Sequence, residues 1–374
     1  MLSCACSGAS SSVKLTPVNT ALYVRADSDD TTVWAPRLNM GSRLGDGTTL
    51  AATYAVDAWT GASIDVVTAA TEAIHEVRQE VTPSIAHEFS DVTLAAGYRY
   101  SGENDYWSHG GVLSADIDMA SNNTTLGIAL MGAMDTVGRS GDPGFKRPQD
   151  SIGGKVGLTQ VLSSWAVGQL AWDVQRLTGY LASPYRAVAV GGDGLCYRTV
   201  GSQDVPSIAS AFAAPLCLPE SHPHERIRNA VSGKLRMSIG SAGSIGVNYR
   251  FYFDDWAIQS HTIWPDLALL IGEHGTLTLM FRYYTQTDSS FYKPRYLSQN
   301  QDLRYITRDR KMSALYNYRV GAEYIHDVEL GESGDAVLKL ALRGGLTRIH
   351  YQAFIGLSEV DVLELTGLLG LSFR

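Results

Sequence analysis

The chain has 374 residues, of which 45% are hydrophobic and only 18% are charged, and its mean hydropathy is −0.06. Its longest nearly apolar run, residues 126–134, falls well short of the ~20 residues that a membrane-spanning helix needs, which excludes helical spans. The net charge of −8 argues against nucleic acid as a partner. Low charge combined with 37 glycines and 19 tyrosines is typical of an all-β protein with many turns.

The first thirteen residues differ in character from the rest of the chain. Residues 1–13 resemble the end of a secretory signal or a lipoprotein-like attachment region, but the basic start and apolar core of a signal peptide are missing. Cys4 and Cys6 are the candidate lipidation positions, although the residues before each match a lipoprotein box poorly. No linker divides residues 14–374, for which we predict a single domain.

Sixteen segments in which polar and apolar residues alternate follow one another along this domain. A strand places successive side chains on opposite faces, and alternating segments of about ten residues are typical of membrane barrels. In chain order, the predicted strands are Lys14–Ala26, Thr32–Leu44, Thr48–Trp59, His75–Phe89, Val92–Ser101, Ser108–Ala120, Thr124–Asp135, Ser151–Leu162, Trp165–Thr178, Ile227–Ile239, Ser244–Phe253, Ile258–Ile271, Thr276–Gln286, Ala314–Glu329, Ala336–Tyr351 and Asp361–Phe373.

Short turns and mostly longer connections alternate between these segments. The long ones are 61–74, 136–150, 179–226 and 287–313, and the pattern indicates a meander with short periplasmic turns and longer outer loops. An even number of strands would leave both termini on the periplasmic side. The loop 179–226 is long enough to fold inward as a constriction. The turn at Asp254-Asp255-Trp256 is predicted to be a tight connection with an interfacial Trp.

The last strand shows the alternation most clearly. Leu363, Leu365, Leu369 and Phe373 share one face, and the other face is mostly small or polar. A soluble β-sandwich or propeller would also supply alternating strands. However, nearly every strand here has one charge-free face, and no amphipathic helix is present to cover so much apolar surface. We therefore predict an all-β fold, a transmembrane up-and-down antiparallel β-barrel of about sixteen strands, with twelve to eighteen as alternatives.

Several stretches resemble a known family. The stretch 249–256, followed by Ser260-His261-Thr262, is similar to a family of uncharacterised Gram-negative outer-membrane proteins, proteobacterial and myxobacterial, that is filed as a domain of unknown function. The stretches 57–63, 98–106, 281–286 and 291–292 add to the resemblance. It implies an outer-membrane β-barrel without established catalytic residues. It also implies a context of redox-associated envelope systems containing flavin-modified proteins.

Charged residues on the opposite faces of the strands are predicted to line the lumen. Two interpretations stay open: opposed basic and acidic walls across a water-filled pore, or residues that pair across the interior and fill it. About sixteen strands leave an aqueous channel in porins, which favours the pore. The predicted pore-lining residues are Arg37, Arg43, Glu76, Arg78, Glu80, Arg99, Asp116, Lys155, Asp173, Arg228, Lys234, Arg236, Arg250, Asp266, Arg282, Arg319, Glu323, Lys339, Arg343 and Glu364.

Other candidate sites are few. Cys196 and Cys217 bracket a long loop, and in an oxidising compartment we expect a disulfide between them rather than two free thiols. Asp27, Asp29 and Asp30 could hold Ca²⁺ weakly at an outer turn, and the ordinary alternative is a capped β-turn. No metal pattern, nucleophile motif or nucleotide fingerprint occurs, so we expect no cofactor and no enzyme activity.

The function expected from the sequence is that of an integral protein of the bacterial outer membrane, a porin-like pore or conduit for small polar or ionic solutes. The alternative is a plugged structural or scaffolding barrel that binds an envelope partner, for which a redox-associated protein is the candidate. The expected partners are outer-membrane lipid and, during insertion, the barrel-assembly machinery, and a periplasmic or redox protein is a further candidate.

Overall fold

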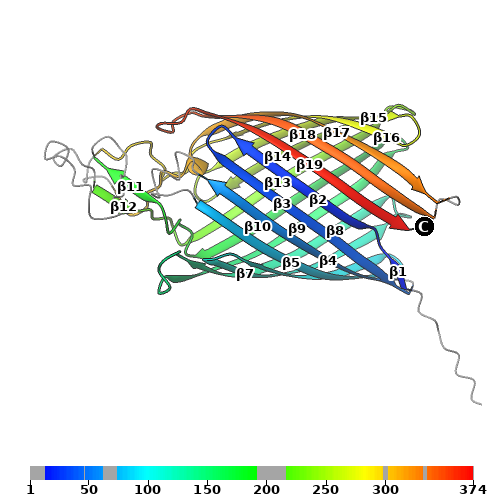
Figure 1. Cartoon of the computed structure of the whole chain (residues 1–374), viewed down its shortest axis with the longest axis horizontal. Helices are drawn as coiled ribbons and strands as arrows, with labels where there is room; N and C mark the ends of the chain where they lie inside the picture. The colour runs from blue at the N-terminus through cyan, green and yellow to red at the C-terminus, as the bar shows by residue number, and fades with distance from the viewer. Residues whose placement is uncertain are drawn as a thin grey trace, which may run out of the picture.

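The computed structural model describes residues 13–45, 47–61, 74–191, 216–297, 302–331 and 335–373. Sixteen long antiparallel strands form one barrel wall (Figure 1). They are β2 (Val18–Asp27), β3 (Thr31–Leu44), β4 (Thr48–Gly61), β5 (Ile74–Glu88), β6 (Val92–Gly102), β7 (Tyr106–Met119), β8 (Thr124–Gly138), β9 (Lys146–Ser163), β10 (Ala166–Gly179), β13 (Glu225–Ser238), β14 (Gly243–Asp254), β15 (Gln259–Ile271), β16 (Gly275–Gln286), β17 (Leu315–Leu330), β18 (Ala336–Tyr351) and β19 (Glu359–Phe373).

The sheet closes because the last strand pairs with the first. Each strand is antiparallel to its neighbours, and β19 pairs with β2 through register partners such as Leu363 and Ala26. Closure leaves the described barrel wall without an unpaired edge strand, which hydrocarbon surroundings require. The predicted fold class and all sixteen predicted strands are thus confirmed. β8 and β9 are longer than predicted, because residues 146–150 of β9 pair with residues 134–138 of β8. The sequence did not reveal this extension, since residues 146–150 are polar and show no alternation.

A short strand, β1 (Val13–Leu15), extends the barrel seam. It pairs with residues 42–44 of β3, while β2 pairs with residues 32–39 of the same strand. β1 and β2 are therefore two parts of one strand of the wall. They are separated at Thr16-Pro17, because Pro17 has no backbone N–H to donate to the ladder.

The two ends of the barrel differ in their connections. We call the end with the short connections the turn end; β1 and the C-terminus also lie there (Figure 1). One of its turns carries Ala120, Ser121 and Asn122 in the left-handed region, with φ of 52°, 55° and 65°. The long connections all lie at the opposite end, which we call the loop end. Short connections also occur at the loop end, at residues 28–30, 103–105 and 255–258. The predicted pattern of short turns at one end and mostly longer connections at the other is therefore confirmed, without a strict alternation.

The outward face of the wall is apolar along most strands. Val320, Leu342 and Leu365 on three successive strands are 55%, 63% and 46% exposed, whereas Asn317 on the opposite face of β17 is 7% exposed. A soluble protein rarely exposes contiguous apolar surface on this scale. The barrel therefore has the apolar exterior of a transmembrane barrel, as the alternation predicted.

Three tyrosine–histidine pairs lie on the outward face towards the loop end. In each pair a tyrosine hydroxyl lies 2.7–2.8 Å from an imidazole nitrogen of the adjacent strand; the pairs are Tyr98–His109, Tyr249–His261 and Tyr318–His350. Such side chains have an apolar body and a polar tip, which suits the boundary between hydrocarbon and water. They correspond to the aromatic girdle of membrane barrels.

Two long loops pack together beyond the loop end (Figure 1). A two-stranded sheet of β11 (Ala187–Val190) and β12 (Leu216–Pro219) carries Val188 and Val190, which pack with Tyr296 and Ile306 of the β16–β17 loop. We call this packed unit the loop cap. It also contains the three-residue 3₁₀ helix η1 (Arg310–Met312). No helix in the described part of the chain is long and apolar enough to cross a membrane.

The loop cap corrects one expectation. The described parts of the loop 179–226 extend away from the barrel along its axis and do not form a constriction inside it. The reason is that their apolar residues find partners in the β16–β17 loop, where Tyr296 and Ile306 are 2% and 1% exposed. Residues 192–215 lie outside the described residues.

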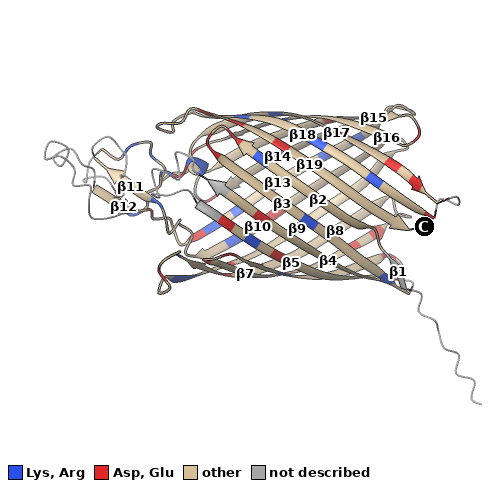
Figure 2. Cartoon of the chain, in the orientation of Figure 1, with Lys and Arg blue, Asp and Glu red and all other residues tan. Residues whose placement is uncertain are grey.

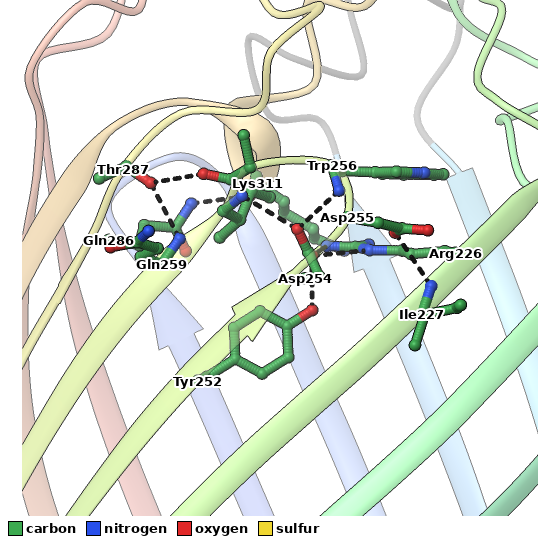
Figure 3. Close-up of polar contacts among 12 residues, drawn as sticks. Arg226, Ile227, Tyr252, Asp254, Asp255, Trp256, Gln259, Gln286, Thr287 and Lys311 are labelled. Atoms are coloured by element: carbon green, nitrogen blue, oxygen red, sulfur yellow. Dashed lines mark hydrogen bonds and ion pairs between the residues drawn. The ribbon is translucent and has the colours of Figure 1, made fainter.

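The Asp254 carboxylate fixes the β14–β15 turn at the barrel rim (Figure 3). It accepts hydrogen bonds from the Arg226 guanidinium at 2.9 and 2.5 Å, from the Tyr252 hydroxyl at 2.6 Å, and from the backbone N–H groups of Trp256 and Ile258. The predicted tight turn is present. The prediction of an interfacial Trp256 is wrong, because its indole is 3% exposed and packs against Phe291 of the β16–β17 loop.

Candidate functional site: the barrel interior

Strand alternation and register place all twenty predicted pore-lining residues on the face opposite the apolar exterior. The register pairs them mainly with one another or with small and polar residues, as for Arg250 with Thr262 and Glu323 with Arg343. Charged positions are distributed along the strands of the wall (Figure 2). The inner face is therefore polar along the length of the barrel.

A cavity of about 950 Å³ lies in the interior. Its lining runs from Lys155 on β9 to Glu323 on β17, so it is bounded by seven strands. Polar neutral side chains, among them Asn248, Thr262 and Asn317, share the lining with the charged ones. Residues that are distant in sequence thus face one common space, which the period-two pattern alone does not reveal.

Ion pairs on the inner face join neighbouring strands or strands two apart. They are Arg236–Asp266 at 2.5 Å, Arg319–Glu364 at 3.2 Å, Arg99–Glu80 at 3.3 Å, Lys155–Asp173 at 3.7 Å and Arg343–Glu323 at 3.9 Å. Most of these side chains stay partly exposed, and ion pairs of this kind contribute about 0–1 kcal/mol each. Their main effect is to hold the side chains along the wall.

Glycines on the inner face allow two of these ion pairs to lie flat against the backbone of the intervening strand. A Cβ at Gly246 would stand 2.4 Å from Asp266 Oδ2 and 2.7 Å from Arg236 Nη2, so the β13–β15 pair crosses directly over this glycine of β14. Similarly, a Cβ at Gly345 would meet the Arg319 guanidinium at 2.7 Å. Because the pairs lie against the backbone, they do not extend across the barrel.

The signs of the charges differ between opposite sides of the barrel. Inner-face carboxylates such as Glu76, Glu80 and Asp116 lie on the β4–β8 side, while arginines such as Arg250 and Arg282 lie on the β13–β18 side. In the closed order of sixteen strands, β6 and β16 lie opposite each other. The interior therefore has an acidic wall facing a basic wall, one of the two arrangements predicted.

The acidic wall continues into the β6–β7 connection at the loop end. Burial raises the pKa of the Glu103 carboxyl, and the charges of Asp105 and Asp57 raise it further, while Arg78 opposes this. Burial likewise raises the pKa of Asp105. These two carboxyl groups therefore take up protons at a higher pH than free carboxylates, and acidification reduces the negative charge at this mouth first.

The carboxylates of the acidic turn that was the calcium candidate form hydrogen bonds and an ion pair within the protein. Asp27 Oδ1 accepts from the N–H groups of Asp29 and Thr31, which is the capped-turn alternative, and Asp29 pairs with Arg310 of η1 at 2.5 Å. Nowhere in the described ranges do three His, Cys, Asp or Glu side chains come together in a way that could hold a metal ion.

Cys217, on β12, is disulfide-bonded. The predicted partner, Cys196, lies outside the described residues, as do the lipidation candidates Cys4 and Cys6. The bonded Cys217 lies in the loop cap, beside the apolar cluster of Val188 and Tyr296. The disulfide therefore belongs to the loop cap and not to the barrel interior.

Comparisons with known proteins bear on the fold and the family. The model of a family described as a protein of unknown function (DUF3570) matches residues 69–149 and 145–340. The structure is similar to that of Pseudomonas aeruginosa OprD, with a TM-score of 0.47, 11% identity and 98% of each chain covered. It is also similar to P. aeruginosa OccD3 (OpdP), with a TM-score of 0.43, 11% identity and 97% and 92% coverage.

A third similar structure is the CymD monoaromatic hydrocarbon channel, with a TM-score of 0.44, 8% identity, and 97% of this chain and 89% of that chain covered. No curated protein matches the chain in sequence.

Proposed function

This chain belongs to the DUF3570 family, and from that premise we propose that it is an integral β-barrel of the bacterial outer membrane that serves as a porin-like pore for small polar or ionic solutes. The observation that carries the proposal is the polar interior cavity of about 950 Å³ inside a barrel with an apolar exterior. The proposal involves no cofactor and no catalytic step. Outer-membrane lipid and, during insertion, the barrel-assembly machinery are its partners.

The arrangement of the lumen charges supports a pore over a filled interior. Two of the ion pairs lie along the wall over Gly246 and Gly345, so these charged side chains do not extend across the barrel. Opposed acidic and basic walls produce a transverse field, which orients polar solutes and selects among ions. A barrel of sixteen strands is wide enough for a water-filled channel.

Single-channel recording tests this proposal. We expect the purified barrel to produce discrete, long-lived conductance steps in a planar lipid bilayer, because the polar cavity inside the proposed pore would hold water and ions. A shift in gel mobility between unheated and heated samples serves as the control for folding. Silent bilayers with a folded barrel would contradict the pore and favour a plugged scaffolding barrel whose loop cap or turns bind an envelope partner.

A further inference from the structure

Three basic side chains of the cavity have no carboxylate partner within the described ranges. Lys234, Arg250 and Arg282 all line the cavity, and none of them is joined to an acidic side chain. The other two basic residues of the lining are paired, Lys155 with Asp173 and Arg236 with Asp266. The lining therefore holds five basic and three acidic residues, although the chain as a whole has a net charge of −8.

Arg282 occupies an unfavourable electrostatic position. Its register partner across β16–β17 is Arg319, and like charges directly opposite each other destabilise a sheet. Arg319 is compensated by Glu364 at 3.2 Å, whereas Arg282 donates to the Asn317 amide oxygen, also at 3.2 Å. The Arg282 Nε is buried and finds no hydrogen-bond partner among the residues that the structure describes. An anion beside Arg282 would remove both deficits.

Neutral hydrogen-bonding groups connect the two free arginines. Arg250 is in register with Thr262, Thr262 with Tyr284, and Tyr284 with Asn317, so these side chains form a row across four strands. Arg282 lies two residues before Tyr284 and hence on the same face of β16. Thr262 on β15 therefore lies between Arg250 on β14 and Arg282 and Tyr284 on β16, and Asn317 follows on β17. All of these residues line one cavity, and the Tyr284 hydroxyl also donates to Gln286 Oε1 at 2.6 Å.

We propose that this group of residues, the basic site (Lys234, Arg250, Arg282, Thr262, Tyr284 and Asn317), binds a small oxyanion that bears a carboxylate or phosphate group. Guanidinium groups recognise both through paired, charge-assisted hydrogen bonds. A cavity of about 950 Å³ has the size of small-molecule sites. The inference that this oxyanion is a transported solute rests on the proposed pore. Binding of the oxyanion to the basic site does not, because binding is measured separately from conduction.

The test is isothermal calorimetry of the full-length barrel, folded in detergent at low salt, with succinate and with inorganic phosphate as probes. The double variant Arg250→Gln/Arg282→Gln is expected to weaken binding by at least about tenfold for each arginine removed. The matched control, Arg43→Gln/Lys339→Gln, removes the same charge from inner-face positions outside the cavity lining. Its affinity is expected to stay within about twofold of the unsubstituted protein.

The outcomes separate the two proposals. Binding of succinate alone identifies the site as carboxylate-specific, binding of phosphate alone as phosphate-specific, and binding of both as a general oxyanion site. Absence of binding by both probes, or equal affinity in the Arg250/Arg282 variant, overturns the basic site. Conductance without binding overturns this inference and leaves the pore intact, whereas binding without conductance overturns the pore alone. Gel mobility of heated and unheated samples verifies that each variant is folded.

Discussion

Replacing Leu279 by Arg is expected to reduce the free energy of folding into lipid vesicles by about 2–4 kcal/mol, the range for arginine near the middle of a barrel's lipid-facing surface. Leu279 lies within β16 on the outward face and is 45% exposed in the isolated chain. In a membrane this surface contacts acyl chains, which cannot solvate a guanidinium group. Chemical denaturation of the barrel in vesicles measures the loss.

The adjacent residue provides the matched control. Thr278 precedes Leu279 on the same strand, lines the interior cavity and is in register with Glu323 of β17. Thr278→Arg is therefore expected to change the free energy of folding by less than about 1 kcal/mol, since the new side chain faces the cavity beside Glu323, whose pair with Arg343 is long at 3.9 Å. Equal losses for the two variants, or a larger loss for Thr278→Arg, would contradict the assigned orientation of the wall.

Removing the Asp254 carboxylate is expected to cost about 3–5 kcal/mol of folding free energy, the range for breaking a buried ion pair. The substitution Asp254→Ala leaves Arg226, which is 6% exposed, without its counter-charge, and it also frees the N–H groups of Trp256 and Ile258. Because Trp256 packs against Phe291, we expect the loop cap to become more susceptible to proteolysis than the barrel.

Two controls define the role of the Arg226–Asp254 ion pair. Asp255→Ala removes a single acceptor, for the Ile227 N–H, from an exposed side chain and is expected to cost only about 0.5–1.5 kcal/mol. Arg226→Met combined with Asp254→Ala is expected to be less destabilised than Asp254→Ala alone, because no unpaired buried charge remains. If the double variant were as unstable as the sum of the single variants, the pair would not be coupled.

The strands of the barrel could be predicted from the sequence because lipid and water impose opposite demands on alternate residues. Leu363, Leu365 and Leu369 on one side of β19 show this period directly. The loop cap could not be predicted, because its packing depends on residues that are distant in sequence. β11 and β12 have four residues each, and Val188 and Val190 of β11 are buried by Tyr296 and Ile306, which lie far along the chain. The short apolar run at residues 187–190 is a weak local signal, because it cannot be assigned to a strand by periodicity.

The inner-face positions of the candidate site followed from the same alternation, but their pairing did not. Arg236 reaches Asp266 across an intervening strand only because Gly246 has no side chain, and in the sequence that glycine indicates no more than a weak strand position. The unpaired state of Arg250 and Arg282 depends on register and closure, which bring seven strands around one cavity. Trp256 was misplaced because its burial depends on a distant loop.

The central claim is that apolar side chains of the wall face lipid and charged ones enclose a hydrated lumen. Single cysteines at residues 277–284 of β16, labelled in vesicles with a water-soluble thiol reagent, test it most directly, with native-cysteine labelling subtracted. Reaction is expected at 278, 280, 282 and 284, four positions of the cavity lining, and protection at 277, 279, 281 and 283. The reverse alternation, or uniform labelling along the strand, would contradict it.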